Sequence, residues 1–353
     1  MIRVLIVDDS ALIRKVLTAL INQFPDMEVV GTANDAWQAR DIVNQKKPDV
    51  ITLDIEMPRM DGLSFLAKLM RARPTPVVMI STLTEEGAEA TLRALELGAV
   101  DFLPKPKIAI EENLQRYAGE IAEKIRGAAA ARLQQATFKS PSKRHQPGPA
   151  FASVLKGTEK IIAIGASTGG TEAIKHLLMD LPVATPAVVI TQHMPAGFTR
   201  SFANRLDELC PMRVKEAEHD ERILPGWAYL APGGYHLEIR RSGANYHTFI
   251  SDAPPVNRHR PAVDVMFRSV AEHVGQNAMA VLLTGMGKDG ADGMGAIRAA
   301  GGLTIAQDEA TSLVYGMPKA AVDAGHADKV LALHDIAPTL VKTIVSMGVT
   351  GRV

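Results

Sequence analysis

Residues 50–62 read VITLDIEMPRMDG, and this stretch decides the fold of the N-terminal part of the chain. An apolar run ends in an acidic residue, Asp54, and a turn rich in methionine, proline and glycine follows. The pattern predicts a buried strand that delivers one carboxylate to a loop. A second apolar run, residues 4–9 (VLIVDD), also ends in acid, at Asp8 and Asp9. Because the carboxyl ends of parallel strands meet at one edge of a sheet, we expect these carboxylates to lie together.

Crowded carboxylates repel one another unless a cation lies between them. Mg²⁺ is suited to such a site, since it takes one or two carboxylates together with waters and phosphate oxygens. Two further apolar runs end near a hydroxyl and an amine, at Ser81 (VVMIS) and Lys105 (DFLPKP). A carboxylate beside Mg²⁺, with a lysine and a hydroxyl in reach, can accept a phosphoryl group. The sequence therefore predicts a Mg²⁺-dependent phosphoacceptor site.

Taken in chain order, these features resemble the receiver domain of response regulators, which we expect over residues 1–123. The resemblance implies a flavodoxin-like fold, with a parallel sheet and helices on both faces, and phosphorylation at Asp54. It implies that Asp9, Asp54 and the backbone carbonyl of Glu56 bind Mg²⁺, supported by Asp8, and that Ser81, Phe102 and Lys105 form the switch. The alternative is a flavodoxin-like domain in which a few loops merely end in acidic residues.

The composition of the whole chain limits the remaining possibilities. A length of 353 residues suggests two domains, and a formal net charge of +0 argues against a general nucleic-acid-binding surface. Cys210 is the single cysteine, so an internal disulfide is impossible, as is usual in a reducing cytosol. No apolar run is long enough to cross a bilayer. We therefore expect a cytoplasmic protein that binds no nucleic acid and does not insert directly into a membrane.

A boundary lies between Glu123 and Glu159, because that interval holds no acidic residue and several basic ones. It begins as an alanine-rich, helix-like stretch and continues as SPSKRHQPGPA, whose proline, serine, glycine and positive charge are typical of a linker. We expect a basic linker over residues 124–157. It is either a solvated tether or a tether that also contacts an acidic partner.

The remaining residues, 158–353, again alternate between short apolar runs and helix-like stretches. This pattern predicts a doubly wound α/β domain with a mostly parallel sheet. Residues 227–239 (WAYLAPGGYHLEI) and the ANYHTFISD stretch after them predict an antiparallel hairpin-like excursion. A neutral output domain of this kind is unlike a helix-turn-helix DNA-binding module.

Three of the expected strands end in reactive groups: Ser167 in GASTGG, His193 in TQHMP, and Asp289 in a glycine loop. If these strands are neighbours, the three side chains emerge at one edge of the sheet. Serine, histidine and aspartate are what acyl transfer needs, because the imidazole takes the hydroxyl proton and the carboxylate orients the imidazole. Each residue has another interpretation: a helix N-cap, a structural histidine and a turn aspartate, respectively.

The GASTGG stretch also fits the G-x-S-x-G elbow of α/β-hydrolases, but the chain order Ser, His, Asp differs from the Ser, Asp, His order of that fold. Two other classes of function stay open from the residues alone. One is a nucleotide-binding output domain in which GASTGG cradles phosphate at a helix N-terminus. The other is a non-catalytic scaffold attached to a receiver.

Longer motifs in the second half resemble the methylesterase domain of chemotaxis response regulators: GASTGG, TQHMP, YLAPGGYHLEI, NRHRPAVDVMFRSVA, LLTGMGKDG and IAQDEATSLVYGMPKAA. The resemblance implies that Ser167 is the nucleophile, His193 the general base and acid, Asp289 the orienting carboxylate and the Met286 amide an oxyanion donor. It implies a phosphorylation-activated hydrolase that removes glutamate γ-methyl esters, and deamidates glutamines, on the cytoplasmic helices of chemoreceptors. The implied phosphodonor is the sensor histidine kinase of the two-component chemotaxis system, and no organic cofactor is implied.

Overall fold

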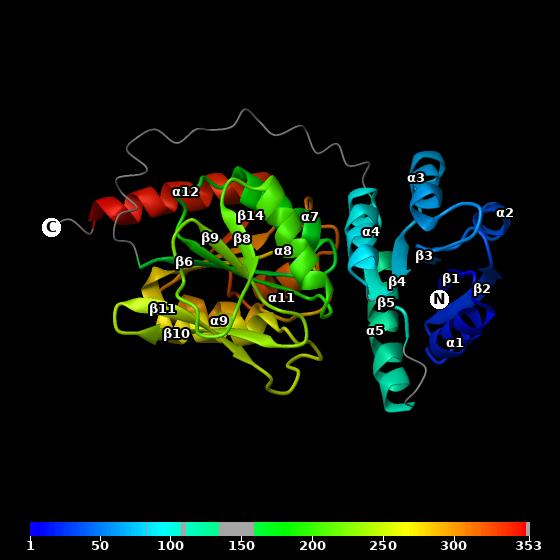
Figure 1. Cartoon of the computed structure of the whole chain (residues 1–353). Coiled ribbons are helices and arrows are strands. Elements are labelled where there is room, and N and C mark those ends of the chain that lie inside the picture. Colours follow the sequence, from blue (N-terminus) through cyan, green and yellow to red (C-terminus); the bar gives the residue numbers. More distant parts are fainter. Residues whose placement is uncertain (83, 107–110, 134–158, 351–353) are drawn as a thin grey trace. The chain divides into compact units, whose positions relative to one another are not determined.

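The computed structural model describes residues 1–82, 84–106, 111–133 and 159–350, and the chain divides into two compact units, Met1–Ala136 and Thr137–Val353 (Figure 1). Most of the expected linker, from residue 134 to residue 157, lies outside the described residues. Its first residues belong to a helix that runs from Glu111 to Ala130.

The first unit is built on a five-stranded sheet in the order β2-β1-β3-β4-β5, in which every neighbouring pair is parallel. Its strands are β1 (Ile2–Val7), β2 (Met27–Ala33), β3 (Val50–Asp54), β4 (Val77–Ser81) and β5 (Asp101–Pro104). Its helices are α1 (Ala11–Ile21), α2 (Ala36–Lys46), α3 (Gly62–Ala72), α4 (Glu85–Glu96) and α5 (Glu111–Ala130). Because the strand order reverses at β1, right-handed crossovers place α1 on one face and α2 to α4 on the other.

The central strands of this sheet are buried because both of their faces are covered. All residues of β3 and β4 are buried, which explains why the sequence shows continuous apolar runs rather than alternation. Leu53 pairs with Val7, so the ends of β1 and β3 lie side by side. Asp54, which ends β3, and Asp8 and Asp9, which follow β1, therefore meet at one edge of the sheet.

The second unit contains a seven-stranded sheet in the order β14-β13-β12-β6-β7-β9-β8, again parallel throughout. Its strands are β6 (Ile161–Ala166), β7 (Ala187–Gln192), β8 (Arg213–Glu216), β9 (Trp227–Leu230), β12 (Ala278–Leu282), β13 (Leu303–Gln307) and β14 (Lys329–Leu331). Its helices are α7 (Gly170–Asp180), α8 (Phe198–Leu209), α9 (Val263–His273), α10 (Ala291–Ala299), α11 (Met317–Asp323), α12 (Leu333–Thr350) and the short 3₁₀ helix η1 (Gly275–Asn277).

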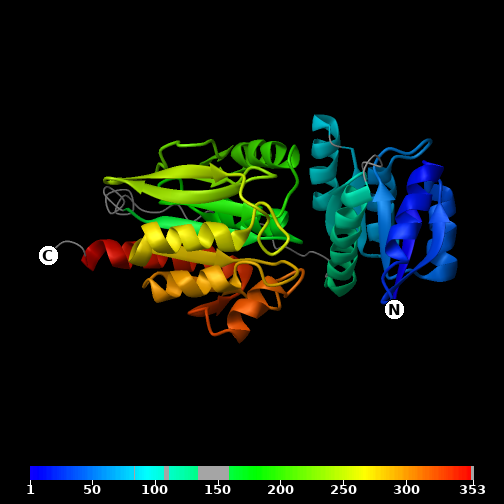
Figure 2. The same cartoon turned by 90° about the horizontal axis from the view of Figure 1, so that it is seen from below.

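The strand order of this sheet changes direction at β6, with β7 on one side and β12 on the other. Such a switch point opens a crevice at the carboxyl ends of the strands, where α/β proteins bind ligands. Helix α12 packs against α7, and α9 packs against α10 and the hairpin formed by β10 (His236–Ser242) and β11 (Asn245–Ser251). Figure 2 shows this hairpin lying over α9. The sheet is thus covered on both faces, as expected for a doubly wound fold.

One expectation about this unit was partly wrong. Residues 227–239 do not form one arm of a hairpin, because Trp227–Leu230 is a parallel strand, β9, between β7 and β8. The antiparallel excursion begins only at His236, after the APGG break, and pairs with Asn245–Ser251. Parallel pairing joins residues that are far apart in sequence, so a local pattern cannot reveal it.

Within the described residues, no helix is both long enough and apolar enough to span a membrane.

Candidate active site and phosphoacceptor site

Ser167 lies in the tight turn between β6 and α7, at the carboxyl edge of the second sheet. Its backbone N–H donates to the Thr284 carbonyl (3.0 Å), and its own carbonyl accepts from the Gly170 N–H (2.7 Å). Gly169, just before the helix, has φ +77, a conformation that side chains other than glycine rarely adopt. The serine is only 3% exposed, so the turn holds it at a sheltered position beside the loop that follows β12.

His193 follows β7, the neighbour of β6, and its backbone N–H donates to the Ala166 carbonyl (3.1 Å). This bond joins the residue after β7 to the last residue of the neighbouring strand, β6. The His193 side chain is buried, and its Nε2 atom lies 2.8 Å from Oδ2 of Asp289. The structure therefore brings together two of the predicted residues that lie 96 positions apart in the sequence.

Asp289, which follows β12, accepts hydrogen bonds on both carboxylate oxygens. Oδ2 accepts from His193 Nε2 (2.8 Å) and from the Val263 N–H (2.6 Å). Oδ1 accepts from Asn257 Nδ2 (2.7 Å) and from the Asp264 N–H (3.2 Å). Burial opposes ionisation, but these donors and the charge of His193 hold the pKa of Asp289 well below its usual range. The carboxylate is therefore ionised and fixed in direction.

The Gly285–Met286 peptide passes directly beside Ser167. A Cβ atom at Gly285 would lie 2.8 Å from the Cβ of Ser167 and 2.3 Å from the sulfur of Met317, so only glycine fits without a shift. The Gly285 carbonyl accepts from the N–H groups of Gly316 and Met317, which fixes the plane of this peptide. Backbone N–H groups held next to a nucleophile are the usual donors to an oxyanion.

The sequence reasoning missed Asn257, His259 and Asp264 as contributors to this site. All three belong to the NRHRPAVD segment, which was noted only as part of a family resemblance. The His259 ring stacks on the His193 ring, with centroids 3.6 Å apart and an interplanar angle of 14°. The local signal was an asparagine in a polar turn before a helix, and such turns are too common to indicate a site by themselves.

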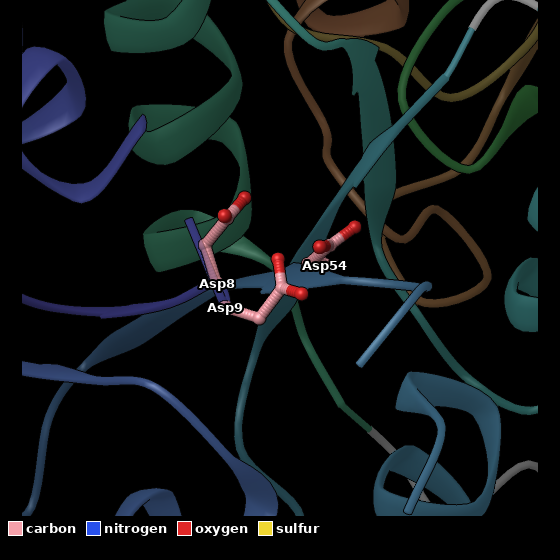
Figure 3. Close-up of side chains that lie close together, drawn as sticks. All are labelled: Asp8, Asp9 and Asp54. Carbon is pink, nitrogen blue, oxygen red and sulfur yellow. The ribbon is translucent and has the colours of Figure 1, made fainter. Parts of the chain in front are cut away.

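In the first unit, Asp8, Asp9 and Asp54 form an acidic cluster at the ends of β1 and β3 (Figure 3). One carboxylate oxygen from each residue lies within 4.8 Å of the others. Oδ2 of Asp8 is buried and accepts no hydrogen bond from any described residue. These oxygens are the hard ligands that Mg²⁺ prefers, and a cluster of this kind in a receiver domain is typical of a Mg²⁺ site.

Asp54 is buried, and its carboxylate has two close donors. Lys105 Nζ lies 2.8 Å from Oδ2, and the Glu56 N–H lies 3.2 Å from Oδ1. Burial, together with the charge of Asp8, raises the pKa of Asp54 to about 6, although Lys105 acts in the opposite direction. Lys105 also lies 3.7 Å from Asp8 Oδ2. Asp54 therefore ionises at a higher pH than an ordinary aspartate.

The other predicted receiver residues take the following positions. The Ser81 hydroxyl is buried and donates to the carbonyl of Gly87 (3.1 Å), which is in α4, and more weakly to that of Thr82 (3.3 Å). Its backbone carbonyl accepts from the Lys105 N–H (2.7 Å), which links the ends of β4 and β5. Phe102 is only 3% exposed. The aromatic ring is therefore already buried in this structure.

Comparison with known proteins covers both units. Residues 4–116 match the model of the response regulator receiver domain, and residues 162–340 match that of the CheB methylesterase. The chain is 58% identical over 347 residues to a protein-glutamate methylesterase/protein-glutamine glutaminase of Cupriavidus pinatubonensis, covering 98% of this chain and 97% of that one. It is 58% identical over 344 residues to the protein of the same description in Pectobacterium atrosepticum, covering 97% of each chain.

Among solved structures, the second unit is similar to the catalytic domain of the Thermotoga maritima CheB methylesterase. The match has 41% sequence identity and a TM-score of 0.51, and it covers 52% of this chain and 98% of that one. These findings decide against the nucleotide-binding and scaffold alternatives. They show that the chain belongs to the CheB family of chemotaxis response regulators, the protein-glutamate methylesterases/protein-glutamine glutaminases.

Proposed function

We propose that Ser167, His193 and Asp289 carry out the methylesterase and glutaminase reactions of this family, under the control of phosphorylation at Asp54. The observation that carries the proposal is the buried His193–Asp289 hydrogen bond (2.8 Å), at the same sheet edge as the turn that holds Ser167. A serine needs a base to become a nucleophile, and a base needs an orienting group.

In the first half of the reaction, the Ser167 hydroxyl attacks the carbonyl carbon of a glutamate γ-methyl ester. His193 takes the hydroxyl proton, and the ionised Asp289 stabilises the imidazolium that forms. When the tetrahedral intermediate collapses, the ester C–O bond breaks and His193 returns the proton, so that methanol leaves. With a glutamine substrate, the C–N bond breaks in the same way and ammonia leaves.

In the second half, water attacks the acyl-enzyme and His193 again transfers the proton, which releases a glutamate carboxylate and restores Ser167. The negative oxygen of both intermediates needs a donor, and we assign the backbone N–H of Met286 to this role. The assignment is supported by the close approach of Gly285 to Ser167. A preorganised N–H of this kind typically contributes about 10²–10³-fold to kcat.

The substrates follow from this chemistry. A methyl group offers little binding energy, so specificity must come from the surrounding receptor surface. We propose that the substrates are methylated cytoplasmic helices of chemoreceptors. The proposed site of action is the cytoplasm, because the ATP that charges a histidine kinase is found there.

In the receiver we assign Asp54 as the phosphoacceptor and Lys105 as the partner of the phosphoryl oxygens. We further propose that the Ser81 hydroxyl exchanges its hydrogen bond to the Gly87 carbonyl for one to the phosphoryl group. Phe102 then changes its packing and alters the neighbouring surface. The phosphodonor is the sensor histidine kinase of the chemotaxis system. Phosphorylation then acts as a local change in charge that biases a two-state element.

Asp9, Asp54 and the Glu56 carbonyl would hold Mg²⁺ in this receiver, with Asp8 supporting them. The fit is supported by the oxygen donors gathered within 4.8 Å and by the buried Asp8 oxygen that lacks a hydrogen bond from any described residue. When bound, Mg²⁺ supplies positive charge to the oxygens of the transferring phosphoryl group. No organic cofactor is needed for either reaction.

We keep the domain assignment as residues 1–123 for the receiver, 124–157 for the linker and 158–353 for the esterase. The α5 helix crosses the first of these boundaries, since it continues to Ala130.

The proposal is tested by measuring methanol release from a methylated receptor and ammonia release from its glutamine form. Ser167→Ala should abolish both reactions, because loss of a triad nucleophile typically costs about 10⁶-fold in kcat. A serine-directed covalent probe should label wild-type protein at Ser167, as located by mass spectrometry of the digest. Wild-type rates in the variant, or labelling elsewhere, would overturn the assignment.

A further inference from the structure

We propose that Asn257 is a positioning residue of the esterase, whose side-chain amide holds the Asp289 carboxylate in the orientation that His193 requires. The inference rests on the proposed roles of Ser167, His193 and Asp289. Asn257 touches none of the reacting atoms in that mechanism and acts only through the carboxylate. It lies in the NRHRPAVD segment, to which the mechanism so far assigns nothing.

The amide of Asn257 joins two buried carboxylates. Its Nδ2 atom lies 2.7 Å from Oδ1 of Asp289 and 2.8 Å from Oδ2 of Asp264. The amino group carries two hydrogens, so it can donate one to each acid. Asp264 and Asp289 are 1% and 2% exposed, so neither charge is relieved by bulk water. Asn257 therefore supplies a donor between two like charges.

Other groups near Asp289 set the electrostatics of this pair. Burial raises the pKa of Asp264, and the charge of Asp289 adds to this effect, while the N–H of Gly293 lowers it. The charged or titratable groups around the two acids are His193 on Oδ2, His259 stacked on His193, Arg268 at 4.0 Å from Asp264, Asp292 beside Arg268, and the exposed Lys288 that precedes Asp289 in the chain.

A neutral donor suits this position better than a cation. A lysine or arginine between the acids would pair with Asp289 and weaken the negative charge that stabilises the His193 imidazolium. The asparagine amide instead satisfies Oδ1 and leaves the net charge on the carboxylate. At metal sites, removing a partner that orients a ligating side chain in this way typically costs about 10- to 100-fold in affinity or activity.

Asn257 lies in a tight turn whose conformation is fixed by the backbone. Val256 and His259 exchange both backbone hydrogen bonds (3.1 and 2.9 Å), which makes a two-residue hairpin turn. Its central residues, Asn257 and Arg258, have φ of 52° and 71°. Asparagine tolerates this region, but arginine does not favour it, and glycine is the usual residue at the second position. Such strain persists where the surroundings require it.

The same turn contacts the imidazole as well as the carboxylate. Asn257 holds Asp289, and His259, two residues later, stacks on His193 at 3.6 Å. Both members of the hydrogen-bonded pair are thus held by one short turn. Asn257 is itself exposed, so its removal leaves no buried cavity.

Loss of the Asn257 amide should change the pKa of His193 in a definite direction. A carboxylate with fewer donors is more basic and attracts a proton on His193 more strongly, so the pKa of that imidazole rises. The general base then needs a higher pH to become neutral. The acid limb of the pH profile of kcat/KM should move to higher pH, and kcat should fall because Oδ1 keeps only the longer bond from the Asp264 N–H (3.2 Å), so the carboxylate is held less firmly.

The test compares Asn257→Gly and Arg258→Gly in the full-length protein, with Mg²⁺, a phosphodonor and a methylated receptor. Glycine adopts both left-handed conformations without strain, so each variant keeps the turn, and only the first removes the amide. For Asn257→Gly we expect kcat to fall about 10- to 100-fold, KM to stay within about 2-fold, and the acid limb to move to higher pH. Arg258→Gly should keep the wild-type acid limb.

The wild-type protein, assayed under the same conditions, contains the same receiver domain, so any effect of receiver titration is common to both proteins. The shift of the acid limb is therefore the difference between the pH profiles of the variant and of the wild type. An unshifted acid limb in Asn257→Gly, or an equal shift in Arg258→Gly, would overturn the proposal. If Asn257→Gly does not fold, as judged by its Tm, the isosteric Asn257→Asp takes its place, and there too an unshifted limb overturns the inference. Ser167→Ala is assayed alongside: if it stays active, the proposed function fails instead.

Discussion

His193 contacts Asp289 through Nε2, at 2.8 Å, so Nδ1 is the ring nitrogen that does not bind the carboxylate. In the serine protease template the carboxylate binds Nδ1 and the serine binds Nε2. Here the carboxylate of Asp289 instead contacts the other ring nitrogen, Nε2. The chain order of the three residues, Ser, His, Asp, is a second difference, because α/β-hydrolases have the order Ser, Asp, His.

The first prediction concerns the tautomer of His193. Because Asp289 is ionised and can only accept, the neutral imidazole should carry its proton on Nε2. The ¹⁵N chemical shifts of His193 at a pH above its titration should show a protonated Nε2 and an unprotonated Nδ1. The histidines of the protein unfolded in denaturant serve as a control and should show the ordinary mixture of tautomers. A protonated Nδ1 in His193 would contradict the proposed direction of proton transfer.

The second prediction is that Asp289→Asn lowers activity strongly, but less than Ser167→Ala. Asp289 accepts four hydrogen bonds on its two oxygens. An asparagine at this position has only one acceptor oxygen, so its NH₂ group must face a donor. We expect kcat to fall about 10⁴-fold, and the free energy of unfolding to fall by about 1–3 kcal/mol. Methanol release and thermal unfolding of both variants provide the measurement. An Asn variant with wild-type kcat would move the orienting role to another carboxylate, with Asp292 and Asp308 tested first.

The third prediction is that Gly285→Ala disables the nucleophile without replacing any predicted catalytic side chain. The added methyl group would lie 2.8 Å from the Cβ of Ser167, so the serine turn or the Met286 peptide must move. A displacement of about 1 Å can cost about 10²-fold in rate. Gly119→Ala is the matched control, because its Cβ would meet nothing within 4 Å. Equal kcat values in the two variants would show that the approach of Gly285 does not matter.

The fourth prediction concerns Mg²⁺ and pH. The pKa of Asp54 is about 6, above its ordinary value of 3.8, so the folded protein keeps a proton that the unfolded chain loses between these values. Without metal, stability should therefore decrease as the pH rises from 4 to 6. Mg²⁺ binds the ionised form, so its apparent association constant should fall by up to about tenfold per pH unit below the pKa.

Calorimetric titration with Mg²⁺ between pH 5 and pH 8 measures this effect, and Asp54→Asn, which cannot titrate, is the control. The increase in Tm caused by Mg²⁺ should likewise be larger at the higher pH. An affinity independent of pH in the wild type would mean that Asp54 is already ionised throughout this range.

The fifth prediction is that phosphorylation of Asp54 raises the activity of the esterase. A small phosphodonor with Mg²⁺ should raise methanol release by the wild type, whereas Asp54→Asn should stay at its basal rate. The phosphoryl group shifts the equilibrium only by its different affinity for the two receiver states. The donor without Mg²⁺ is the control. Activation of Asp54→Asn by the same mixture would show that another residue accepts the phosphoryl group.

Much of this protein could be predicted from short stretches of its sequence. Apolar runs ending in Asp54, Ser167 and His193 predicted buried parallel strands and the edges at which they end. That inference succeeds because a strand covered on both faces must be apolar throughout, and because parallel strands present their carboxyl ends together. The acidic cluster and the His193–Asp289 pair follow from the same geometry.

Tertiary structure alone decided which atoms meet. Trp227–Leu230 became a parallel strand rather than a hairpin arm, because it pairs with β7 and β8 rather than with the segment that follows it. The choice of Nε2 over Nδ1 in His193 depends on how its ring is packed against His259 and on the direction of Asp289. Asn257 gained its role only because the turn that holds it folds against a loop 32 residues away. The hydrophobic pattern of a short segment predicts that the segment forms a strand. Its hydrogen-bond partners depend on long-range packing, which a local pattern does not predict.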